Sequence, residues 1–329
     1  MQKKKFKNLI ITFILTMAFT GFFANAQVRD GDITLTINPE YPSPNQNVNA
    51  SLNSYSTDLN KANITWLINN ETMNSGIGKK SFSFTMENLG ISTVLSATIE
   101  TIDGQNLQKI LTITSSDVDM LWEAYDSYSP PFYKGKTLVP SQGSFKVVAV
   151  PNLMSQNEKI NINNLSYAWI KDDNNQVDSS GWGKNSFIFR NSYLDKTNTV
   201  KVKVSNISGN ANTSGKITLQ TVNPKILFYK NDPLFGVKWE EAISDGYTIN
   251  KNGETFIIEP YFFSPKNINS SNLTFDWSIN GEKIQTPDPK NILSIKPDAG
   301  QSGNAVIKLL INNTKTLFQS MSKQIKVQF

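Results

Sequence analysis

The chain has 329 residues, of which 38% are hydrophobic and 18% are charged, and it contains neither histidine nor cysteine. These two absences exclude Ser-His-Asp and Cys-His catalysis, histidine-coordinated zinc, thiolate metal sites and disulfide bonds. The formal net charge is +5, but the first 26 residues carry four lysines and no acidic residue, so the remainder carries only +1. Without a cluster of Lys and Arg beyond that start, the sequence lacks the basic surface that nucleic-acid binding requires.

The first 26 residues have the features of a secretory signal peptide. Four lysines between positions 3 and 7 precede an apolar run from Leu9 to Phe23, and Ala24-Asn25-Ala26 then supplies a cleavage site of small residues. A run of about 15 residues is short for a bilayer span, which needs roughly 20, so cleavage is favoured over retention as an anchor. We therefore expect a mature chain that starts near Gln27, has no membrane span, and is secreted, extracellular or at the cell surface, with the periplasm as the alternative.

A repeated tryptophan pattern divides the rest of the chain into modules. Trp66, Trp169 and Trp277 each stand at the centre of a short segment in which apolar residues alternate with others, and they are 103 and 108 residues apart. This spacing equals the length of one immunoglobulin-like domain. The pattern predicts three tandem antiparallel β-sandwich domains of the immunoglobulin-like type, at 27–116, 117–223 and 224–329, after the signal peptide at 1–26.

A second repeat follows the first two tryptophans. The segments Gly76–Phe84 and Gly181–Phe189 match at six of nine positions, including two glycines, a lysine and two phenylalanines. The corresponding segment of the third module, 289–295, keeps the alternation but has no glycine. The first two modules are therefore the closer pair of duplicates.

Alternation of apolar and polar residues at period two predicts the remaining strands, because it places one face in a core and the other in water. Turn dipeptides agree with this reading: Asp103-Gly104, Asn252-Gly253 and Asn280-Gly281 supply the positive-φ residues of tight hairpins. The strands predicted in this way are 48–52, 92–102 and 108–114 in the first module, 145–150, 199–204 and 216–222 in the second, and 256–262, 304–311 and 322–329 in the third.

The three tryptophans are predicted to be structural core residues. Apolar residues lie two positions away on the same face of each predicted strand, which favours burial over an exposed, sugar-stacking role. Because there is no cysteine, their neighbours are expected to be aliphatic rather than a disulfide.

Two short joints are predicted, near 115–119 and 222–225. Each is followed by an apolar pair and then by an irregular segment containing proline, Ser129–Lys136 after the first and Asp232–Gly236 after the second. We interpret these segments as one arrangement used twice, in which prolines interrupt strand pairing where the chain enters a new module. Packing between domains explains them, and so does a partner-docking surface. The candidate docking residues are Pro130, Pro131, Phe132, Tyr133, Pro233, Leu234 and Phe235.

Several strings in the second and third modules resemble an uncharacterised group of exported PKD-like or Ig-like multi-domain proteins of candidate-phyla bacteria. The strings are Leu121-Trp122-Glu123-Ala124, Pro130-Pro131-Phe132-Tyr133-Lys134-Gly135-Lys136, Asp232-Pro233-Leu234-Phe235-Gly236 and Glu259-Pro260-Tyr261-Phe262-Phe263-Ser264. Such genes often lie near type IV pilus genes, so the resemblance implies a cell-surface or pilus-linked role with a surface or pilus-assembly protein as partner. It implies no enzymatic activity.

The search for catalytic and metal-binding residues gives few candidates. Glu123 with Asp126, and Glu240 with Glu241, are carboxylate pairs, but their spacing does not distinguish them from solvated surface charge. The segment 171–178 is rich in Asp and Asn and could offer oxygen ligands to calcium, yet it lacks the EF-hand spacing, and a hairpin turn explains the same residues. We predict no catalytic residue, no cofactor and no metal.

Three function classes therefore remain, the third of which is a periplasmic assembly factor or an enzyme. The first is a non-enzymatic structural or adhesive protein of the cell surface, associated with a type IV pilus system. The alternative is a set of secreted carbohydrate-binding modules, which would require Tyr128, Phe132, Tyr133 and Trp182 to form an exposed aromatic row.

Overall fold

A computed structural model describes residues 32–155, 158–209, 211–286 and 288–329. Within these ranges the regular structure consists of β-strands and short 3-10 turns, η2 (Ile162–Asn164) and η3 (Val177–Ser179) among them, with no α-helix. The predicted all-β fold is therefore confirmed. The predicted signal peptide at 1–26 lies outside the described residues, and no helix within them is long and apolar enough to cross a membrane.

The chain divides into two compact units, the first built mainly from β1 to β7 and the second from β8 to β26. Three hydrophobic cores are present, one in the first unit and two in the second. We call the parts around these cores the first sandwich (β1–β7), the second sandwich (β8–β17) and the third sandwich (β18–β26). The two compact units are described separately below.

The first sandwich consists of one three-stranded and one four-stranded sheet, in the orders β1-β2-β5 and β4-β3-β6-β7. Every second residue is buried along the middle of β2 and along β6, where Ser96 is buried as well, so each sheet turns one face to the core. The strands are β1 (Ile33–Asn38), β2 (Asn47–Ser54), β3 (Asn63–Ile68), β4 (Glu71–Ile77), β5 (Ser81–Thr85), β6 (Ser92–Glu100) and β7 (Asn106–Thr114).

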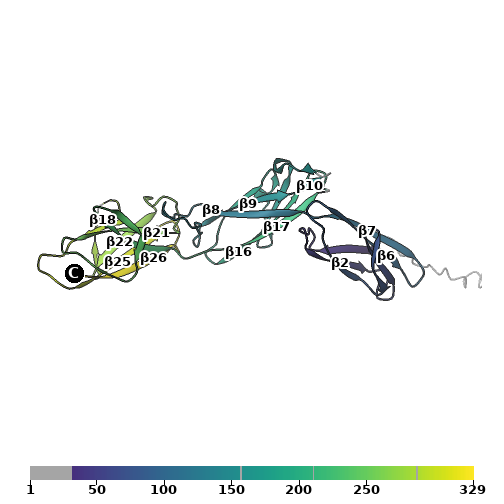
Figure 1. The fold of residues 1–329 in the computed structure, drawn as a ribbon, viewed down its shortest axis with the longest axis horizontal. Coiled ribbons are helices and arrows are strands. Elements are labelled where there is room, and N and C mark those ends of the chain that lie inside the picture. Colours follow the sequence, from purple (N-terminus) through teal and green to yellow (C-terminus); the bar gives the residue numbers. More distant parts are fainter. Residues whose placement is uncertain (1–31, 156–157, 210, 287) are drawn as a thin grey trace, which may run out of the picture. The chain divides into compact units, whose positions relative to one another are not determined.

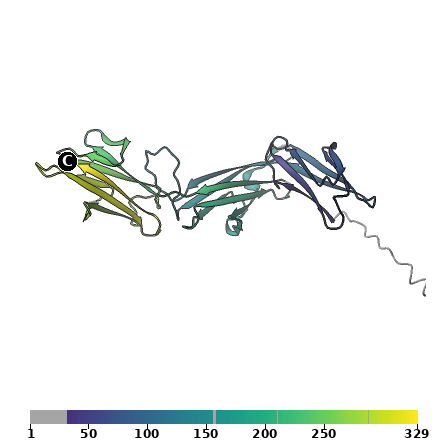
Figure 2. The same ribbon diagram turned by 90° about the horizontal axis from the view of Figure 1, so that it is seen from below.

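The second sandwich repeats this plan with the sheet orders β15-β9-β8 and β13-β12-β16-β17, β14 also pairing with β12. A small separate hairpin is formed by β10 (Met154–Ser155) and β11 (Glu158–Lys159). The other strands are β8 (Asp117–Ala124), β9 (Ser144–Asn152), β12 (Ser166–Lys171), β13 (Asn174–Asn175), β14 (Gly181–Trp182), β15 (Ser186–Arg190), β16 (Thr197–Ser205) and β17 (Asn212–Gln220). Figures 1 and 2 show the long strands β8, β9, β16 and β17 of this sandwich.

The third sandwich has the sheet orders β19-β18-β21-β24 and β20-β26-β25-β22-β23. Its ladders are antiparallel apart from the short parallel pair β20–β26. The strands are β18 (Lys225–Asp232), β19 (Gly236–Ile243), β20 (Gly246–Thr248), β21 (Glu254–Tyr261), β22 (Leu273–Ile279), β23 (Glu282–Ile284), β24 (Ile292–Ile295), β25 (Asn304–Asn313) and β26 (Ser320–Gln328).

The central tryptophans lie inside these cores, with side chains of Trp66, Trp169 and Trp277 exposed by 0%, 1% and 1%. A buried indole N–H needs an acceptor, and in each sandwich a main-chain carbonyl of a lysine 13 to 15 residues later provides it. The three hydrogen bonds run from Trp66 Nε1 to Lys79 O (2.7 Å), from Trp169 Nε1 to Lys184 O (2.9 Å) and from Trp277 Nε1 to Lys290 O (3.0 Å).

This carbonyl explains the glycine-lysine repeat. Gly78 and Gly183, each just before its lysine, have φ of +71° and +67°, which L side chains rarely adopt. A Cβ on Gly78 would also lie 2.9 Å from the Asn60 carbonyl oxygen. The glycines thus turn the chain so that the lysine carbonyl faces the indole, and in the third sandwich Pro289-Lys290 reaches the same acceptor position without them.

Two of the three predicted tight hairpins are present. Asp103-Gly104 connects β6 to β7, and Asn280-Gly281 connects β22 to β23, with positive φ at both glycines. The hairpin predicted at Asn252-Gly253 is wrong: the turn is there, but it joins β20 to β21, which belong to different sheets. A turn dipeptide fixes the local φ angle and does not determine which strands pair.

Candidate functional site

The main candidate site is the joint, by which we mean the contact of residues 125–143 of the second sandwich with the third sandwich; both belong to one compact unit. Strand β8 ends at Ala124 and β9 begins at Ser144, so the loop between them is free to leave its own sandwich. Pro130, Pro131 and Pro140 in this loop cannot donate to a strand ladder. Val139, near the end of the loop, is buried in the core of the second sandwich, whereas the middle of the loop packs on the third sandwich.

Tyr128 forms a single β-bridge with the third sandwich. Its main-chain N–H donates to Phe263 O, and its carbonyl accepts from Phe262 N–H, both at 2.7 Å. Its side-chain hydroxyl donates to Glu259 Oε2 at 2.8 Å. Three hydrogen bonds from one residue thus fix the loop to β21 and the turn that follows it.

Aromatic rings fill the rest of this contact. Phe132 stacks on Trp239, with ring centroids 4.0 Å apart and ring planes at 24°, and meets Tyr229 edge to face. Tyr133 meets Tyr261 edge to face at 5.5 Å. Such pairs contribute about 0.5–1.5 kcal/mol each to stability, beyond the contribution of their buried area. The rings therefore form a packed interface between the two sandwiches.

A buried carboxyl lies beneath these rings. Glu259 is buried, and the only side-chain hydrogen bond described for it comes from Tyr128. Burial raises the pKa of the Glu259 carboxyl, and the hydrogen bond from Tyr128 opposes this rise only in part. Burial, and then the nearby charge of Glu259, raise the pKa of the Tyr128 hydroxyl. Both groups therefore favour their neutral forms compared with free side chains.

This pKa shift predicts a pH dependence. Because the folded-state pKa of Glu259 lies above its usual 4.5, the folded protein holds this proton more tightly than the unfolded chain. The resulting stability is present below about pH 4.5 and is lost as the pH rises through the folded pKa. We expect Glu259→Gln to stabilise the protein at pH 7 and to flatten the change of melting temperature with pH. Thermal melts over a pH series would measure both, with Glu241→Gln on the exposed surface as control; an unchanged pH profile in Glu259→Gln would contradict the assignment.

A second set of contacts closes the other side of the joint. The Gln319 amide donates from Nε2 to Ser141 O at 2.8 Å and accepts at Oε1 from Ser264 N (3.0 Å) and Asn313 Nδ2 (3.1 Å). Phe318 N donates to Gln142 Oε1 at 3.3 Å. Gln319 is buried, so its amide is a structural connector between the two sandwiches.

The predicted docking residues fall in two different places. Pro130 is buried, Phe132 and Tyr133 are half-buried against the third sandwich, and Pro131 is exposed. By contrast Pro233, Leu234 and Phe235 form the tip of the β18–β19 hairpin, with Leu234 and Phe235 87% and 84% exposed. The interpretation of one arrangement used twice is wrong: the chain after β18 returns and pairs with it as β19, whereas the loop after β8 crosses to another sandwich. Docking of a partner by either group stays a prediction.

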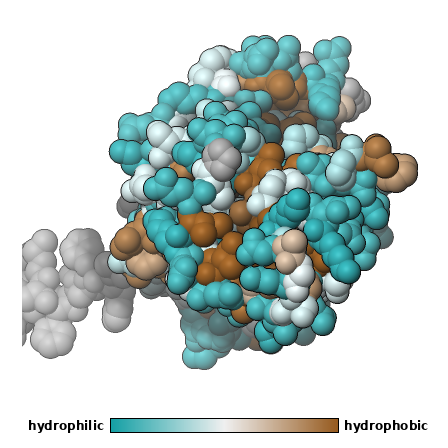
Figure 3. All heavy atoms as spheres, turned by 90° about the vertical axis from the view of Figure 1, so that its left-hand side faces the viewer, coloured by the Kyte–Doolittle hydropathy of each residue, from teal (hydrophilic) through white to brown (hydrophobic). Residues whose placement is uncertain are grey.

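The hairpin tip lies toward the end of the third sandwich at which the C-terminus is found, because Asn231 pairs with Thr255 at the start of β21 and Ile249, just before β21, donates to Gln328 O. Figure 3 looks at this end and shows apolar patches among hydrophilic side chains.

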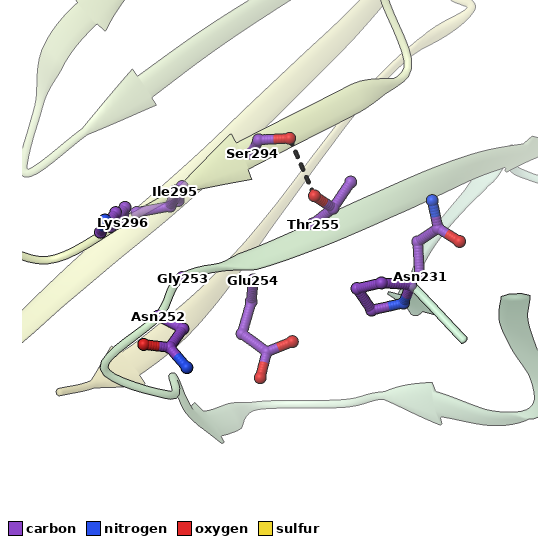
Figure 4. Close-up of a pocket in the computed structure, with 9 residues that line it drawn as sticks. Asn231, Asn252, Gly253, Glu254, Thr255, Ser294, Ile295 and Lys296 are labelled. Carbon is purple, nitrogen blue, oxygen red and sulfur yellow. Dashed lines mark hydrogen bonds between the residues drawn. The ribbon is translucent and has the colours of Figure 1, made fainter. Parts of the chain in front are cut away.

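A pocket of about 280 Å³ opens beside β21 and β24. Figure 4 shows Thr255 and Ser294, whose hydroxyls are 2.9 Å apart, on the side of β21 opposite Glu254. The carboxylate of Glu254 already accepts from Lys230 Nζ (3.3 Å) and from Asn250. The acidic side chain of this pocket therefore already has partners within the protein.

The four aromatic residues considered for sugar stacking do not form a row. Tyr128, Phe132 and Tyr133 contact the third sandwich. Trp182 is exposed on β14, where it pairs with Ser166 of β12, so it lies at the same end of the sheet as Ser205, away from the joint. The row predicted for a carbohydrate-binding module is therefore absent at these residues.

The carboxylates considered for catalysis and calcium binding have ordinary partners. Glu123 pairs with Lys146 at 3.2 Å, and Asp126 accepts from Ser144 N at 2.8 Å. In the segment 171–178, Asp172 and Asp173 have φ of +47° and +63° in a turn and pair with Lys171 and Lys201. Among the described residues, no group of three or more acidic side chains could hold a metal ion.

Sequence reasoning missed Trp239, Glu259 and Gln319, which are among the residues that the third sandwich contributes to the joint. Glu259 entered only through a string that carried the family resemblance. Trp239 precedes Glu240 and Glu241, the pair that was considered for catalysis. A tryptophan outside the central pattern was the available signal, because a large aromatic side chain that is not needed in the core is often found at an interface.

The fold and the joint define a class of protein: tandem immunoglobulin-like β-sandwiches, two of which share a packed, hydrogen-bonded interface. No protein-family model matches the chain, and no curated protein sequence matches it. Among solved structures it is similar to the fibronectin(III)-like modules of Clostridium thermocellum CbhA, at 13% identity over 57% of this chain and 94% of that one, with a TM-score of 0.27.

Two further structures show the same kind of likeness. The three N-terminal domains of the bacteriophage RB49 outer capsid protein Hoc match at 10% identity over 90% of this chain and 98% of that one, with a TM-score of 0.27. Immunoglobulin domains 1–5 of Sidekick-1 match at 10% identity over 90% and 59%, with a TM-score of 0.22. These likenesses concern the fold alone and carry no inference about ligand or activity.

Proposed function

We propose that this chain is a non-enzymatic extracellular or cell-surface protein with a structural and adhesive role. The observation that supports the proposal is the joint, in which an aromatic stack, a β-bridge and the Gln319 amide hold the second and third sandwiches together. An interface built from buried rings and paired polar groups keeps two modules in one orientation, as a spacer that presents a surface must do. The signal peptide expected at 1–26 supplies the export that this role needs.

The types of reactive side chain in the sequence agree with a role that is not catalytic. Without histidine and cysteine, an enzyme would depend on carboxylates, lysine or hydroxyl groups. The carboxylates first considered for that purpose are exposed or are bound to neighbouring groups. Pilus association is a finer part of the proposal and rests on the family resemblance of the second and third modules.

Surface labelling would test the proposal. Intact cells that naturally produce the protein would be treated with a membrane-impermeant, amine-reactive reagent, and the chain would then be isolated and its modified lysines mapped. We expect exposed lysines such as Lys216 and Lys308 to be labelled on intact cells, while a cytoplasmic marker protein is not. Labelling only after lysis would contradict a surface location. Cross-linking on the same cells would test the pilus part, which requires pilins or pilus-assembly proteins among the linked partners.

A further inference from the structure

A second pocket, of about 160 Å³, opens at the joint and is lined from both sandwiches. Asp126 and Arg190 come from the second sandwich, and Ser264, Asn272, Lys315 and Thr316 come from the third. A pocket formed by two modules exists only while the joint is closed, so the contacts of Tyr128, Phe132 and Gln319 also shape this one.

The two cations of the pocket are available to a ligand. Arg190 donates from Nε to Gln142 O at 2.8 Å. This hydrogen bond orients the guanidinium group, and its two terminal nitrogens can still donate to a ligand. Among the described residues, neither Arg190 nor Lys315 forms an ion pair. The one acid, Asp126, already accepts from Ser144 N at 2.8 Å and from Ser144 Oγ at 3.1 Å. The pocket is therefore cationic and suited to a carboxylate, which a guanidinium binds with two parallel hydrogen bonds.

Two hydroxyl groups beside these cations lack partners. Ser264 and Thr316 are 6% and 2% exposed, and neither Ser264 Oγ nor Thr316 Oγ1 has a hydrogen-bond partner. A buried hydroxyl without a partner is energetically unfavourable, because it has lost its hydrogen bonds to water. Because both residues line the pocket, rotation about the Cα–Cβ bond can turn each hydroxyl toward a ligand there. A ligand rich in hydroxyl groups would satisfy them.

An exposed pair of aromatic rings adjoins the pocket. Tyr193 and Phe318 stack with centroids 4.8 Å apart and ring planes at 18°, yet they remain 52% and 51% exposed. Gln142 connects this pair to the cations, because its carbonyl accepts from Arg190 and its side chain accepts from Phe318 N. Tyr193 comes from the second sandwich and Phe318 from the third, so rings and pocket form one surface across the joint.

We propose that this surface binds a sugar residue that carries a carboxylate, such as a uronate unit of a glycan. Arg190 and Lys315 would hold the carboxylate, Ser264, Thr316 and the Asn272 amide would bond to ring hydroxyls, and the outer face of Tyr193 or Phe318 would pack on the C–H face of the neighbouring sugar. A uronate unit combines a carboxylate, several hydroxyl groups and an apolar C–H face, which are the three features that this surface can bind. The inference rests on the proposed function, since it names the ligand class of the adhesive role.

Calorimetric titration of the full chain with trigalacturonate tests the inference. We expect binding that weakens at least about tenfold in Lys315→Ala, and likewise in Arg190→Lys, which keeps the charge but removes the paired hydrogen bonds. Phe318→Ala is also expected to weaken it. The matched control is Trp182→Ala, which removes an exposed aromatic ring of the second sandwich away from the joint. Melting temperatures would establish that each variant is folded.

Three results with the parent chain would overturn the inference. They are the absence of trigalacturonate binding, equally tight binding of a neutral trisaccharide of the same length, and equally tight binding of acetate, which would show a simple anion site. Binding that is lost in Trp182→Ala and kept in Lys315→Ala would place the glycan elsewhere and also overturn it. Surface labelling of intact cells is independent of these titrations, so a surface-exposed chain that binds no uronate refutes the ligand and leaves the proposed function standing.

Discussion

Replacing Trp169 with alanine is expected to destabilise the second sandwich by about 3–5 kcal/mol. The indole is 1% exposed, lies 5.7 Å from the ring of Phe187, and donates its N–H to Lys184 O. Alanine removes the ring, opens a cavity and leaves that carbonyl without its donor. Hydrogen exchange of the full chain in increasing urea, read by mass spectrometry in peptides from β12 and β16, would measure the loss in this sandwich separately.

Two further substitutions at tryptophans separate the causes of this loss. Trp169→Phe keeps most of the ring but removes the donor, so we expect a smaller loss of about 1–3 kcal/mol. Trp182→Ala removes an exposed ring and should change the stability by no more than about 0.5 kcal/mol. A loss below about 1 kcal/mol in Trp169→Ala would contradict the assignment of this residue to the core.

Replacing Phe132 with alanine is expected to loosen the joint while both sandwiches stay folded. The ring stacks on Trp239 at 4.0 Å and meets Tyr229, so its removal takes away about 2–3 kcal/mol of area burial and ring pairing. Because the chain has no cysteine, single cysteines can be placed at Lys216 in β17 and Lys308 in β25 and spin-labelled without further changes. Electron-electron distance measurements should give a narrow distribution in the parent chain and a broad one in Phe132→Ala.

The hairpin tip of the third sandwich offers the control for this experiment. Leu234 is as apolar as Phe132 and is almost fully exposed, so Leu234→Ala should leave the distance distribution unchanged. A distribution that stays narrow in Phe132→Ala would show that the β-bridge and the Gln319 amide hold the joint without the aromatic stack. A parent distribution that is already broad would contradict a fixed joint altogether.

Much of the fold could be predicted because its signals are local. Apolar residues around Trp66, Trp169 and Trp277 alternate at period two, and this alternation is the direct consequence of burying one face of a strand. The glycine-lysine repeat marked a duplicated segment whose purpose was not apparent. Its main-chain carbonyl serves the indole of a residue 13 to 15 positions earlier, and a sequence pattern does not show what a carbonyl binds.

The sequence indicated where the joint lies but not which residues contact each other in it. The proline-rich, aromatic segment after β8 indicated an interface, yet its partners lie far along the chain: Tyr128 and Glu259 are 131 residues apart, and Ser141 and Gln319 are 178 apart. Contacts between residues so far apart in the chain depend on how two sandwiches approach each other. The alternation of apolar and polar residues along a strand carries no information about that approach. The same limit explains why the segment after β18 was expected to behave like the one after β8, although it folds back on its own strand.

The joint also gives the chain a particular response to pulling. The second and third sandwiches are connected by the covalent chain near residues 222–225 and, beside it, by the non-covalent contacts of the joint, which include the bridge from Tyr128 to Phe263. The bridge has only two main-chain hydrogen bonds, whereas the ladder between β18 and β21 runs over seven residue pairs. Under tension we expect the bridge and the ring stacks to part first, lengthening the chain while the sandwiches stay intact, and to re-form when the load is removed. Such a joint would let the chain extend reversibly under load without unfolding a sandwich.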